Sequence, residues 1–240
     1  MKIPLEDGPS DIIGKAQRGL KLPNETAPAK LGISAAALQA LEAKTWYPND
    51  PSAIADLACF NTPFQDMTVN SYLVFDPVSK VAAAFDTGAD CSGMLQLPVT
   101  IQQIFLTHIH TDHVMELDLL KEKTGAKPFV SAREPINGAE AFAEGKKFQI
   151  GSLTVETRRT SRHARGGVTY VVTGLAKRLA ICGDAVFAGS MGGGAVSYEE
   201  ALRTNKESIL TLPDDTVICP GHGPLTTVVE EKLHNPFFAK

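Results

Sequence analysis

The segment Thr107–Val114 holds four side chains that can bind a metal ion. It reads Thr-His-Ile-His-Thr-Asp-His-Val, so His108, His110, Asp112 and His113 fall within six positions. Three of the chain's six histidines lie in it. Neutral imidazole and carboxylate are ligands that zinc, iron and manganese accept. This density of ligands is not that of an ordinary surface or core pattern, and it predicts a metal site.

The spacing within the segment separates the four side chains into two pairs. Residues two apart point the same way in an extended segment, so His108 and His110 can reach one cation. Asp112 and His113 are adjacent, so their side chains diverge and suit a second cation a few ångströms away. The apolar pattern of Ile101–Thr107 predicts a buried strand just upstream. The cluster should therefore lie where a strand runs into a loop, where enzymes commonly place their chemistry.

Three further residues could complete the site. His163 lies in a glycine-rich loop before a strand, Asp184 ends an apolar strand, and His222 follows a short strand. Taken singly, each has an ordinary interpretation, because a strand-end aspartate commonly forms a turn. Together with the first cluster, they predict a larger site whose residues come from the ends of several strands.

These residues, in this order, resemble the metallo-β-lactamase fold superfamily over residues 66–226. The matching positions are His108-x-His110-x-Asp112-His113, His163, Asp184, His222, Asp86-Thr87-Gly88 and Asn70–Val74. Within the superfamily the chain looks most like the glyoxalase II branch, or hydroxyacylglutathione hydrolases. The segments similar to that branch are Phe187–Gly192, Leu212–Val217, Pro220–Pro224 and Asn235–Phe238. The fold that the resemblance implies is α/β (α+β), a four-layer αββα sandwich.

The resemblance also implies a role for each site residue. His108, His110 and His163 would hold one divalent metal ion; Asp112, His113 and His222 would hold the other. Asp184 would bridge the two metals, and Asp86 would orient a ligand imidazole. Asp112 and Asp184 are the expected catalytic carboxylates. Zinc is the favoured metal, although iron and manganese accept the same ligands.

Two bridged dications would share a water molecule and lower its pKa toward about 7, which makes a hydroxide available at neutral pH. The expected reaction is attack of that metal-bridging hydroxide on the carbonyl carbon of a small-molecule thioester. Lactone or ester hydrolysis is compatible with the same residues, and so is an iron-dependent persulfide dioxygenase. The chain has no Gly-x-Ser-x-Gly elbow of a serine hydrolase.

Two departures from the glyoxalase II pattern concern the substrate. The branch commonly has an arginine after Gly-Ser-Met-Gly, but Gly193, Gly194 and Ala195 follow here. The full-length glutathione thioesterases add a helical C-terminal domain with basic residues, whereas this chain stops soon after Phe238. The resemblance therefore leaves open whether glutathione is recognised.

The elements that would position the site begin at residue 68. The pattern predicts strands at 68–75, 81–85, 101–107, 127–130, 148–150, 153–157, 168–172, 178–182 and 217–219, and helices at 115–123, 134–144 and 198–212. Hairpins interrupted by helices are typical of sheets with helices packed outside them. Residues 53–240 are therefore expected to form the hydrolase domain.

Residues 1–52 are predicted to be a separate helical extension. Helices are expected at 11–20, 24–31 and 34–45, the last capped by Ser34, followed by a linker at 47–52. The segment is weakly similar to a repressor helix-turn-helix, which would make the protein a DNA-linked sensor. Residues 1–50, however, carry six Lys or Arg and six Asp or Glu, and DNA affinity depends on neutralising phosphates. We therefore expect these helices to pack on the hydrolase or to pair subunits into a homo-oligomer, rather than to bind nucleic acid.

The bulk composition fits a cytoplasmic enzyme. The net charge is −4, which argues against nucleic acid as a partner, and no 18-residue apolar stretch predicts a membrane span. The N-terminus lacks the apolar run of a signal peptide. The four cysteines are scattered without a CxxC pair, as expected in a reducing compartment.

Overall fold

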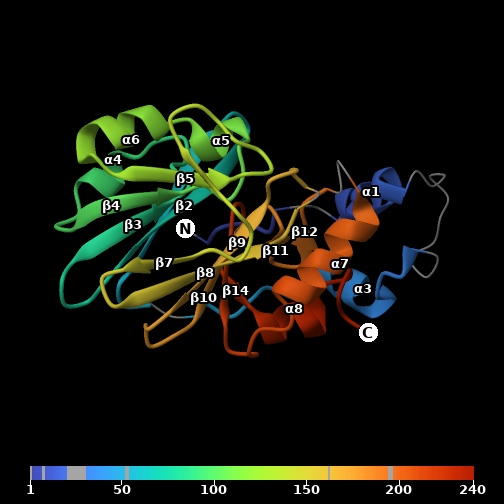
Figure 1. Cartoon of the computed structure of the whole chain (residues 1–240). Coiled ribbons are helices and arrows are strands. Elements are labelled where there is room, and N and C mark those ends of the chain that lie inside the picture. Colours follow the sequence, from blue (N-terminus) through green and yellow to red (C-terminus); the bar gives the residue numbers. More distant parts are fainter. Residues whose placement is uncertain (1, 7–8, 21–30, 52–53, 162, 194–196) are drawn as a thin grey trace.

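The computed structural model describes residues 2–6, 9–20, 31–51, 54–161, 163–193 and 197–240. Two large β-sheets face each other, and helices cover the outer face of each (Figure 1). The layers therefore follow the order helix, sheet, sheet, helix. This arrangement confirms the predicted αββα sandwich.

The first sheet contains six strands in the order of the chain. They are β1 (Leu57–Phe64), β2 (Met67–Phe75), β3 (Val81–Phe85), β4 (Thr100–Phe105), β5 (Lys127–Ser131) and β6 (Glu140–Phe142). The strands β1, β2 and β3 pair antiparallel, whereas β3 to β6 pair parallel. Because β3 and β4 are parallel, the loops after their carboxyl ends lie side by side.

The second sheet contains six strands in the order β14-β13-β10-β9-β8-β7. Their bounds are β7 (Lys147–Ile150), β8 (Leu153–Arg159), β9 (Val168–Thr173), β10 (Leu179–Gly183), β13 (Val217–Pro220) and β14 (Thr226–Thr227). The neighbouring strands β10 and β13 are parallel, so their carboxyl ends also meet at one edge. A short hairpin, β11 (Val186–Phe187) and β12 (Ser190–Met191), follows β10.

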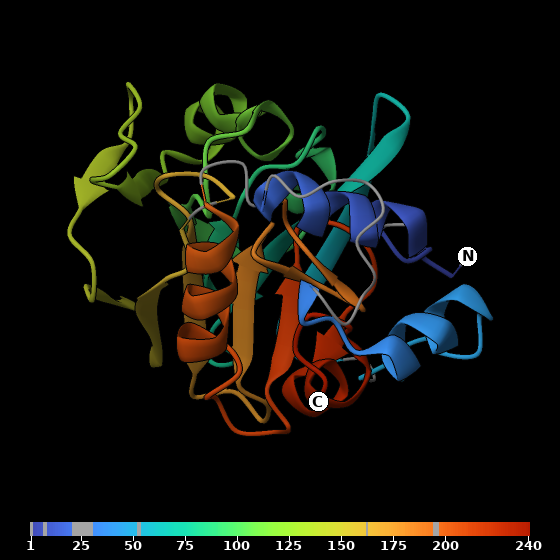
Figure 2. The same cartoon turned by 90° about the vertical axis from the view of Figure 1, so that its right-hand side faces the viewer.

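The helices form the two outer layers. Covering the first sheet are α4 (Ser92–Leu95), α5 (Thr111–Val114) and α6 (Leu117–Thr124); α1 (Pro9–Leu20), α3 (Ala35–Glu42), α7 (Tyr198–Ser208) and α8 (Val228–His234) cover the second. In Figure 2, α7 (orange) and α8 (red) lie in front of the second sheet, α1 (dark blue) lies across its upper end, and α3 (light blue) lies beside it. The two termini of the chain thus contribute helices to the same layer.

Each interface between layers is filled by a cluster of buried apolar side chains. The cluster between the sheets is rich in aromatic rings: the Phe105 ring centroid lies 4.9 Å from that of Phe148 and 5.2 Å from those of Phe85 and Tyr170. These separations are typical of favourable aromatic pairs. This packing fixes the position of one sheet relative to the other, which a site built from both sheets requires.

The described N-terminal helices pack against the sandwich rather than standing apart from it. Helices 11–20 and 34–45 were expected, and α1 and α3 confirm them, with Ser34 accepting a cap hydrogen bond from the Ala37 amide. Ile12 and Ala16 belong to the same apolar cluster as Ala201 of α7. Residues 24–30 of the helix expected at 24–31 lie outside the described residues. The division at residue 52 into extension and hydrolase stays a prediction.

One predicted element was wrong and others were misplaced or missed. Residues 134–144 were expected to be a helix, but only 140–142 are regular there, as strand β6 pairing with β5. Pro135 disfavours helix at the preceding residue, Gly138 has a φ of +85°, and Phe142 buries its ring in the core. The helix expected at 198–212 ends at Ser208. The sequence reasoning missed β1, β11, β12, β14, α4, α5 and α8.

The remaining predicted strands are present, with bounds shifted by at most two residues.

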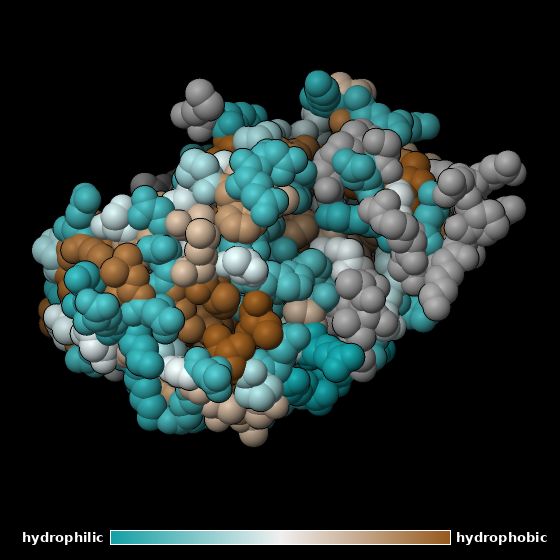
Figure 3. Space-filling model, turned by 90° about the horizontal axis from the view of Figure 1, so that it is seen from above, coloured by the Kyte–Doolittle hydropathy of each residue, from teal (hydrophilic) through white to brown (hydrophobic). Residues whose placement is uncertain are grey.

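Figure 3 shows the molecule from above, relative to the view of Figure 1. This face is largely hydrophilic, and its hydrophobic side chains gather in a few patches. No helix among the described residues combines the length and apolar character needed to cross a bilayer.

Candidate metal centre

The candidate site lies where strands of both sheets end. The segment that follows β4 carries His108 and leads to α5, which begins after His110 and contains Asp112 and His113. Asp184 follows β10, and His222 follows β13 two residues later. Because β10 pairs parallel with β13, these two side chains emerge at the same edge of the second sheet. His163 comes from the loop between β8 and β9.

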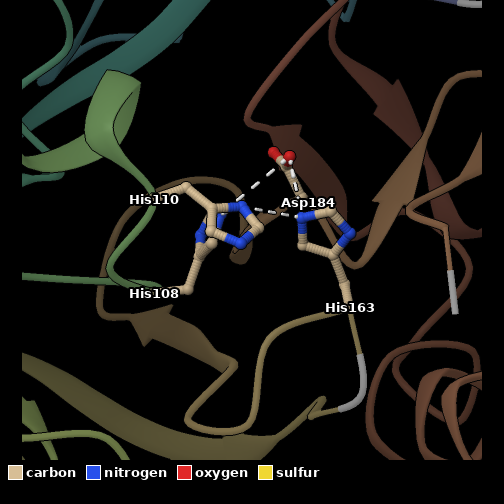
Figure 4. A group of neighbouring side chains, drawn as sticks. All are labelled: His108, His110, His163 and Asp184. Carbon is tan, nitrogen blue, oxygen red and sulfur yellow. Dashed lines mark hydrogen bonds and ion pairs between the residues drawn. The ribbon is translucent and has the colours of Figure 1, made fainter. Parts of the chain in front are cut away.

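Three imidazoles and one carboxylate form the first group (Figure 4). His110 Nδ1 lies 3.1 Å from both His108 Nε2 and His163 Nε2. His163 Nε2 lies 3.3 Å from Asp184 Oδ2. Nitrogens bound tetrahedrally to one zinc at 2.0–2.1 Å would lie about 3.4 Å apart. The group therefore has the spacing of ligands around a single cation.

Asp112, His113 and His222 form a second group beside the first. Asp112 Oδ2 lies 3.3 Å from His222 Nε2 and 3.6 Å from His113 Nε2. Asp184 reaches this group too, with Oδ1 3.2 Å from His113 Nε2 and Oδ2 3.5 Å from His222 Nε2. All seven side chains predicted from the sequence are thus brought together, and the Asp184 carboxylate touches both groups.

Four of the five imidazoles are oriented through their Nδ1 atoms. His113 Nδ1 lies 2.7 Å from Asp86 Oδ2, and His222 Nδ1 lies 2.7 Å from the Thr68 carbonyl oxygen. His108 and His163 contact Thr107 Oγ1 and the Gly193 carbonyl at 3.0 and 3.2 Å. A proton on each Nδ1 leaves the Nε2 lone pair directed into the site. His110 differs, because its Nδ1 is the atom that faces the other ligands.

Two buried atoms in the site lack a hydrogen-bond partner among the described residues: His113 Nε2 and Asp184 Oδ1. They are 3.2 Å apart, but they do not point along a hydrogen bond to each other. An unpaired buried polar atom costs roughly 1–3 kcal/mol unless something else satisfies it. A divalent cation would satisfy both, so the donor set fits a metal.

The pKa values of His108 and His113 also bear on metal binding. Burial lowers the pKa of His108 well below its usual value, and the neighbouring His113 lowers it further. Burial also disfavours a proton on His113, but Asp184 and Asp86 outweigh it and raise its pKa to about 10. Because metal ligands must be deprotonated, metal binding would release the His113 proton. Metal affinity should accordingly rise with pH.

Asp86 is grouped with His108 and His113 by distance, yet its oxygens are already engaged. It is buried with a φ of +55°, and it accepts hydrogen bonds from the Thr107 amide at 2.7 Å and the Thr107 hydroxyl at 2.7 Å. Its second oxygen also faces His113 Nδ1. We conclude that Asp86 positions the segment after β4 and the His113 ring, in agreement with its predicted orienting role.

Replacing Asp86 by alanine should weaken metal binding by roughly 10–100-fold, the usual effect of losing an outer partner of a metal ligand. The His113 ring would lose the acceptor that fixes its tautomer. Competition with a chromophoric chelator measures the affinity. The matched control is Asp90→Ala, which removes an exposed carboxylate nearby that accepts from the Ser92 amide. Equal affinities of the two variants would contradict the role of Asp86.

Five of the seven side chains line an open cleft of about 690 Å³: His110, Asp112, His163, Asp184 and His222. Phe64, Gln65 and Met67 from the β1–β2 hairpin line one side. Lys15 of α1 and Glu6 line it as well. The sequence reasoning did not identify these last five positions, since nothing local in the sequence marks a residue that reaches the site only through packing.

The chain is similar to known proteins over the residues that carry the candidate site. The model of the metallo-β-lactamase superfamily matches residues 65–222. A probable metallo-hydrolase of Bacillus subtilis, YqgX, is 34% identical over 160 residues, covering 56% of this chain and 74% of that protein. The hydroxyacylglutathione hydrolase GloC of Haemophilus influenzae is 27% identical over 205 residues, covering 73% and 94%. The crystal structure of the BLEG-1 B3 metallo-β-lactamase matches with a TM-score of 0.66 at 27% identity, covering 76% and 100%.

Proposed function

The chain belongs to the metallo-β-lactamase superfamily, and we propose that it hydrolyses thioesters with two divalent metal ions. His108, His110 and His163 would hold one ion, Asp112, His113 and His222 the other, and Asp184 both. The observation that carries the proposal is the Asp184 carboxylate, which lies within 3.5 Å of imidazole nitrogens of both groups. The second group offers ligands for a second ion, although an enzyme with a single iron could retain the same residues.

The ions, when bound, would supply Lewis acidity and a water of lowered pKa. The protein's part is to hold the ligand atoms in place and to shape the cleft. Five ring nitrogens face the site, and the Nδ1 partners prevent most of the rings from turning away. Phe64 and Met67 offer an apolar wall for an acyl chain. A thiolate leaves readily, so thioester cleavage needs no dedicated general acid.

The choice of thioester is supported by the similarity to a hydroxyacylglutathione hydrolase. We propose zinc as the metal, because tetrahedral sites of imidazole and carboxylate suit it. Iron and manganese accept the same ligands, so the metal has to be measured.

Metal analysis of the purified protein, combined with a substrate panel, tests the proposal. We expect about two metal ions per chain and release of free thiol from acyl thioesters, with loss of activity after chelation and recovery on adding zinc. The panel includes a lactone, a carboxylic ester and a β-lactam, and oxygen uptake is followed with a persulfide. One iron per chain with oxygen uptake would overturn the proposal in favour of a persulfide dioxygenase. Cleavage of the lactone or ester alone would leave the metal site and reject the thioester.

A further inference from the structure

The β11–β12 hairpin forms part of the cleft and contacts the first ligand group. Phe187 ends β11 and lines the cleft, with its ring centroid 5.8 Å from that of His222. Gly192 and Gly193 follow β12 and line the cleft as well. The Gly193 carbonyl oxygen lies 3.2 Å from His163 Nδ1. The position of the hairpin therefore affects how the His163 ring is held.

Asn235, which follows α8, binds both strands of this hairpin. Its side chain is fully buried. The side-chain amide donates to the Ser190 carbonyl at 2.8 Å and to the Phe187 carbonyl at 3.5 Å. The side-chain oxygen accepts from the Phe237 amide at 3.0 Å. One asparagine side chain thus ties the C-terminal turn of the protein to the hairpin.

Glu231, one turn earlier on α8, binds the tip of the same hairpin. Its Oε2 accepts from the Gly189 amide at 3.1 Å and from Asn235 Nδ2 at 2.7 Å, and its Oε1 accepts from the Thr226 hydroxyl at 2.7 Å. Burial raises the pKa of Glu231 to about 7, although these three donors act in the opposite direction. A carboxyl group is buried at low cost only where hydrogen bonds satisfy it. The carboxyl group and the hairpin therefore hold each other in place.

We propose that Asn235 and Glu231 are positioning residues for the metal centre. By holding the β11–β12 hairpin, they fix the Gly193 carbonyl that orients His163 and the Phe187 side of the cleft. Neither residue belongs to the ligand groups or lines the cleft, so each acts through the hairpin. This inference rests on the proposed metal centre and does not depend on the substrate being a thioester.

Replacing Asn235 by alanine removes the amide that joins α8 to the hairpin. We expect zinc affinity to fall about 10-fold, at the low end of the loss caused by removing an outer partner of a metal ligand. Competition with a chromophoric chelator measures it. Glu231→Leu removes the acceptor at the hairpin tip and should cause a similar loss. It also provides the test if Asn235→Ala does not fold.

Glu231→Gln is the conservative variant. Its amide oxygen can accept from Gly189 and Asn235, and its NH₂ group can donate to the Thr226 hydroxyl, which also accepts hydrogen bonds. We therefore expect zinc affinity within about twofold of wild type. A loss as large as in Glu231→Leu would contradict a role that depends on these hydrogen bonds.

The chain's single tryptophan, Trp46, reports the position of the hairpin. A Cβ atom at Gly189 would lie 2.8 Å from Trp46 Cζ3, so the indole packs against the hairpin tip. We expect its fluorescence emission to move to longer wavelength in Asn235→Ala and Glu231→Leu, because a displaced tip exposes the ring to water. Weaker zinc binding with unchanged emission in both variants would overturn the inference, since the hairpin would not have moved.

Asn49→Ala is the matched control. It breaks the other asparagine–glutamate pair of α8, in which Asn49 Nδ2 donates to Glu230 Oε1 at 2.9 Å, away from the hairpin. Zinc affinity should stay within about twofold of wild type, and thermal unfolding compares the stability of the variants. Wild-type zinc affinity in Asn235→Ala, or an equal loss in Asn49→Ala, would overturn the inference.

Zinc binding separates this inference from the proposed hydrolysis. A wild type that binds zinc but cleaves no thioester would refute thioester hydrolysis. In that case, weaker zinc binding by Asn235→Ala than by Asn49→Ala would still support the positioning role, and equal binding would reject it. A wild type that binds no zinc would overturn the proposed zinc centre and the inference together.

Discussion

Replacing Asp184 by alanine is expected to abolish hydrolysis and to remove both metal ions together. Asp184 is the side chain shared by the two ligand groups, and it contacts His163, His113 and His222 at 3.2 to 3.5 Å. Loss of an outer partner costs roughly 10–100-fold in metal affinity, so loss of a shared ligand should exceed that. We expect kcat/KM to fall by about 1,000-fold or more, as for essential catalytic groups. Metal analysis and kinetics on the same preparation measure both effects.

The conservative variant and a remote histidine serve as controls. Asp184→Asn keeps the size of the side chain and one oxygen but loses the charge, so we expect it to retain part of the metal. His234→Ala should leave kcat/KM within about twofold, because the His234 ring stacks on Trp46 outside the metal groups. The substitution removes only that packing contact. Circular dichroism confirms that each variant folds. Full activity or full metal content in Asp184→Ala would refute the proposed site.

The candidate metal ligands could be predicted from the sequence in two different ways. The segment around His108 and Asp112 could be interpreted from local spacing, because side-chain direction along an extended stretch depends on neighbours alone. His163, Asp184 and His222 lie far apart in the sequence, and their convergence depends on strand order in the second sheet. Their grouping into one site came from the family resemblance, since nothing in the local pattern states which strands pair.

The failures have a common physical cause. The segment 134–144 is rich in helix-forming residues, but pairing at the edge of a sheet and burial of Phe142 decided its structure. Propensity is a weak effect that tertiary contacts override. Lys15 escaped notice for the same reason, because its place in the cleft depends on how α1 packs against α7.

Gly221 is a position at which any side chain would overlap with residues of the candidate site. A Cβ atom there would lie 2.2 Å from Asp184 Oδ1 and 2.6 Å from His113 Cε1. The backbone cannot move aside easily, because its amide donates to the Gly183 carbonyl at 2.8 Å and its carbonyl accepts from the Asn70 amide at 2.7 Å. These hydrogen bonds tie Gly221 to strands of both sheets, so an added methyl group must displace the side chains of the site.

Gly221→Ala is therefore expected to damage the metal centre more than the fold. We expect metal affinity to fall by about 100-fold and kcat/KM by at least as much, since ligand geometry tolerates little displacement. Overpacking should lower the free energy of unfolding by about 1–3 kcal/mol. Chelator competition, kinetics and denaturant unfolding measure the three quantities.

Gly93→Ala is the matched control, since its Cβ would lie 2.9 Å from two atoms of the Phe60 ring, away from the metal groups. That variant should lose a similar amount of stability while keeping metal affinity and kcat/KM. Similar losses of stability in the two variants, with loss of metal affinity in Gly221→Ala alone, would show that Gly221 is required by the site and not by packing in general. If Gly221→Ala binds metal as tightly as wild type, Asp184 and His113 have room to move. The absence of a side chain at Gly221, just after β13, is then not needed for metal binding.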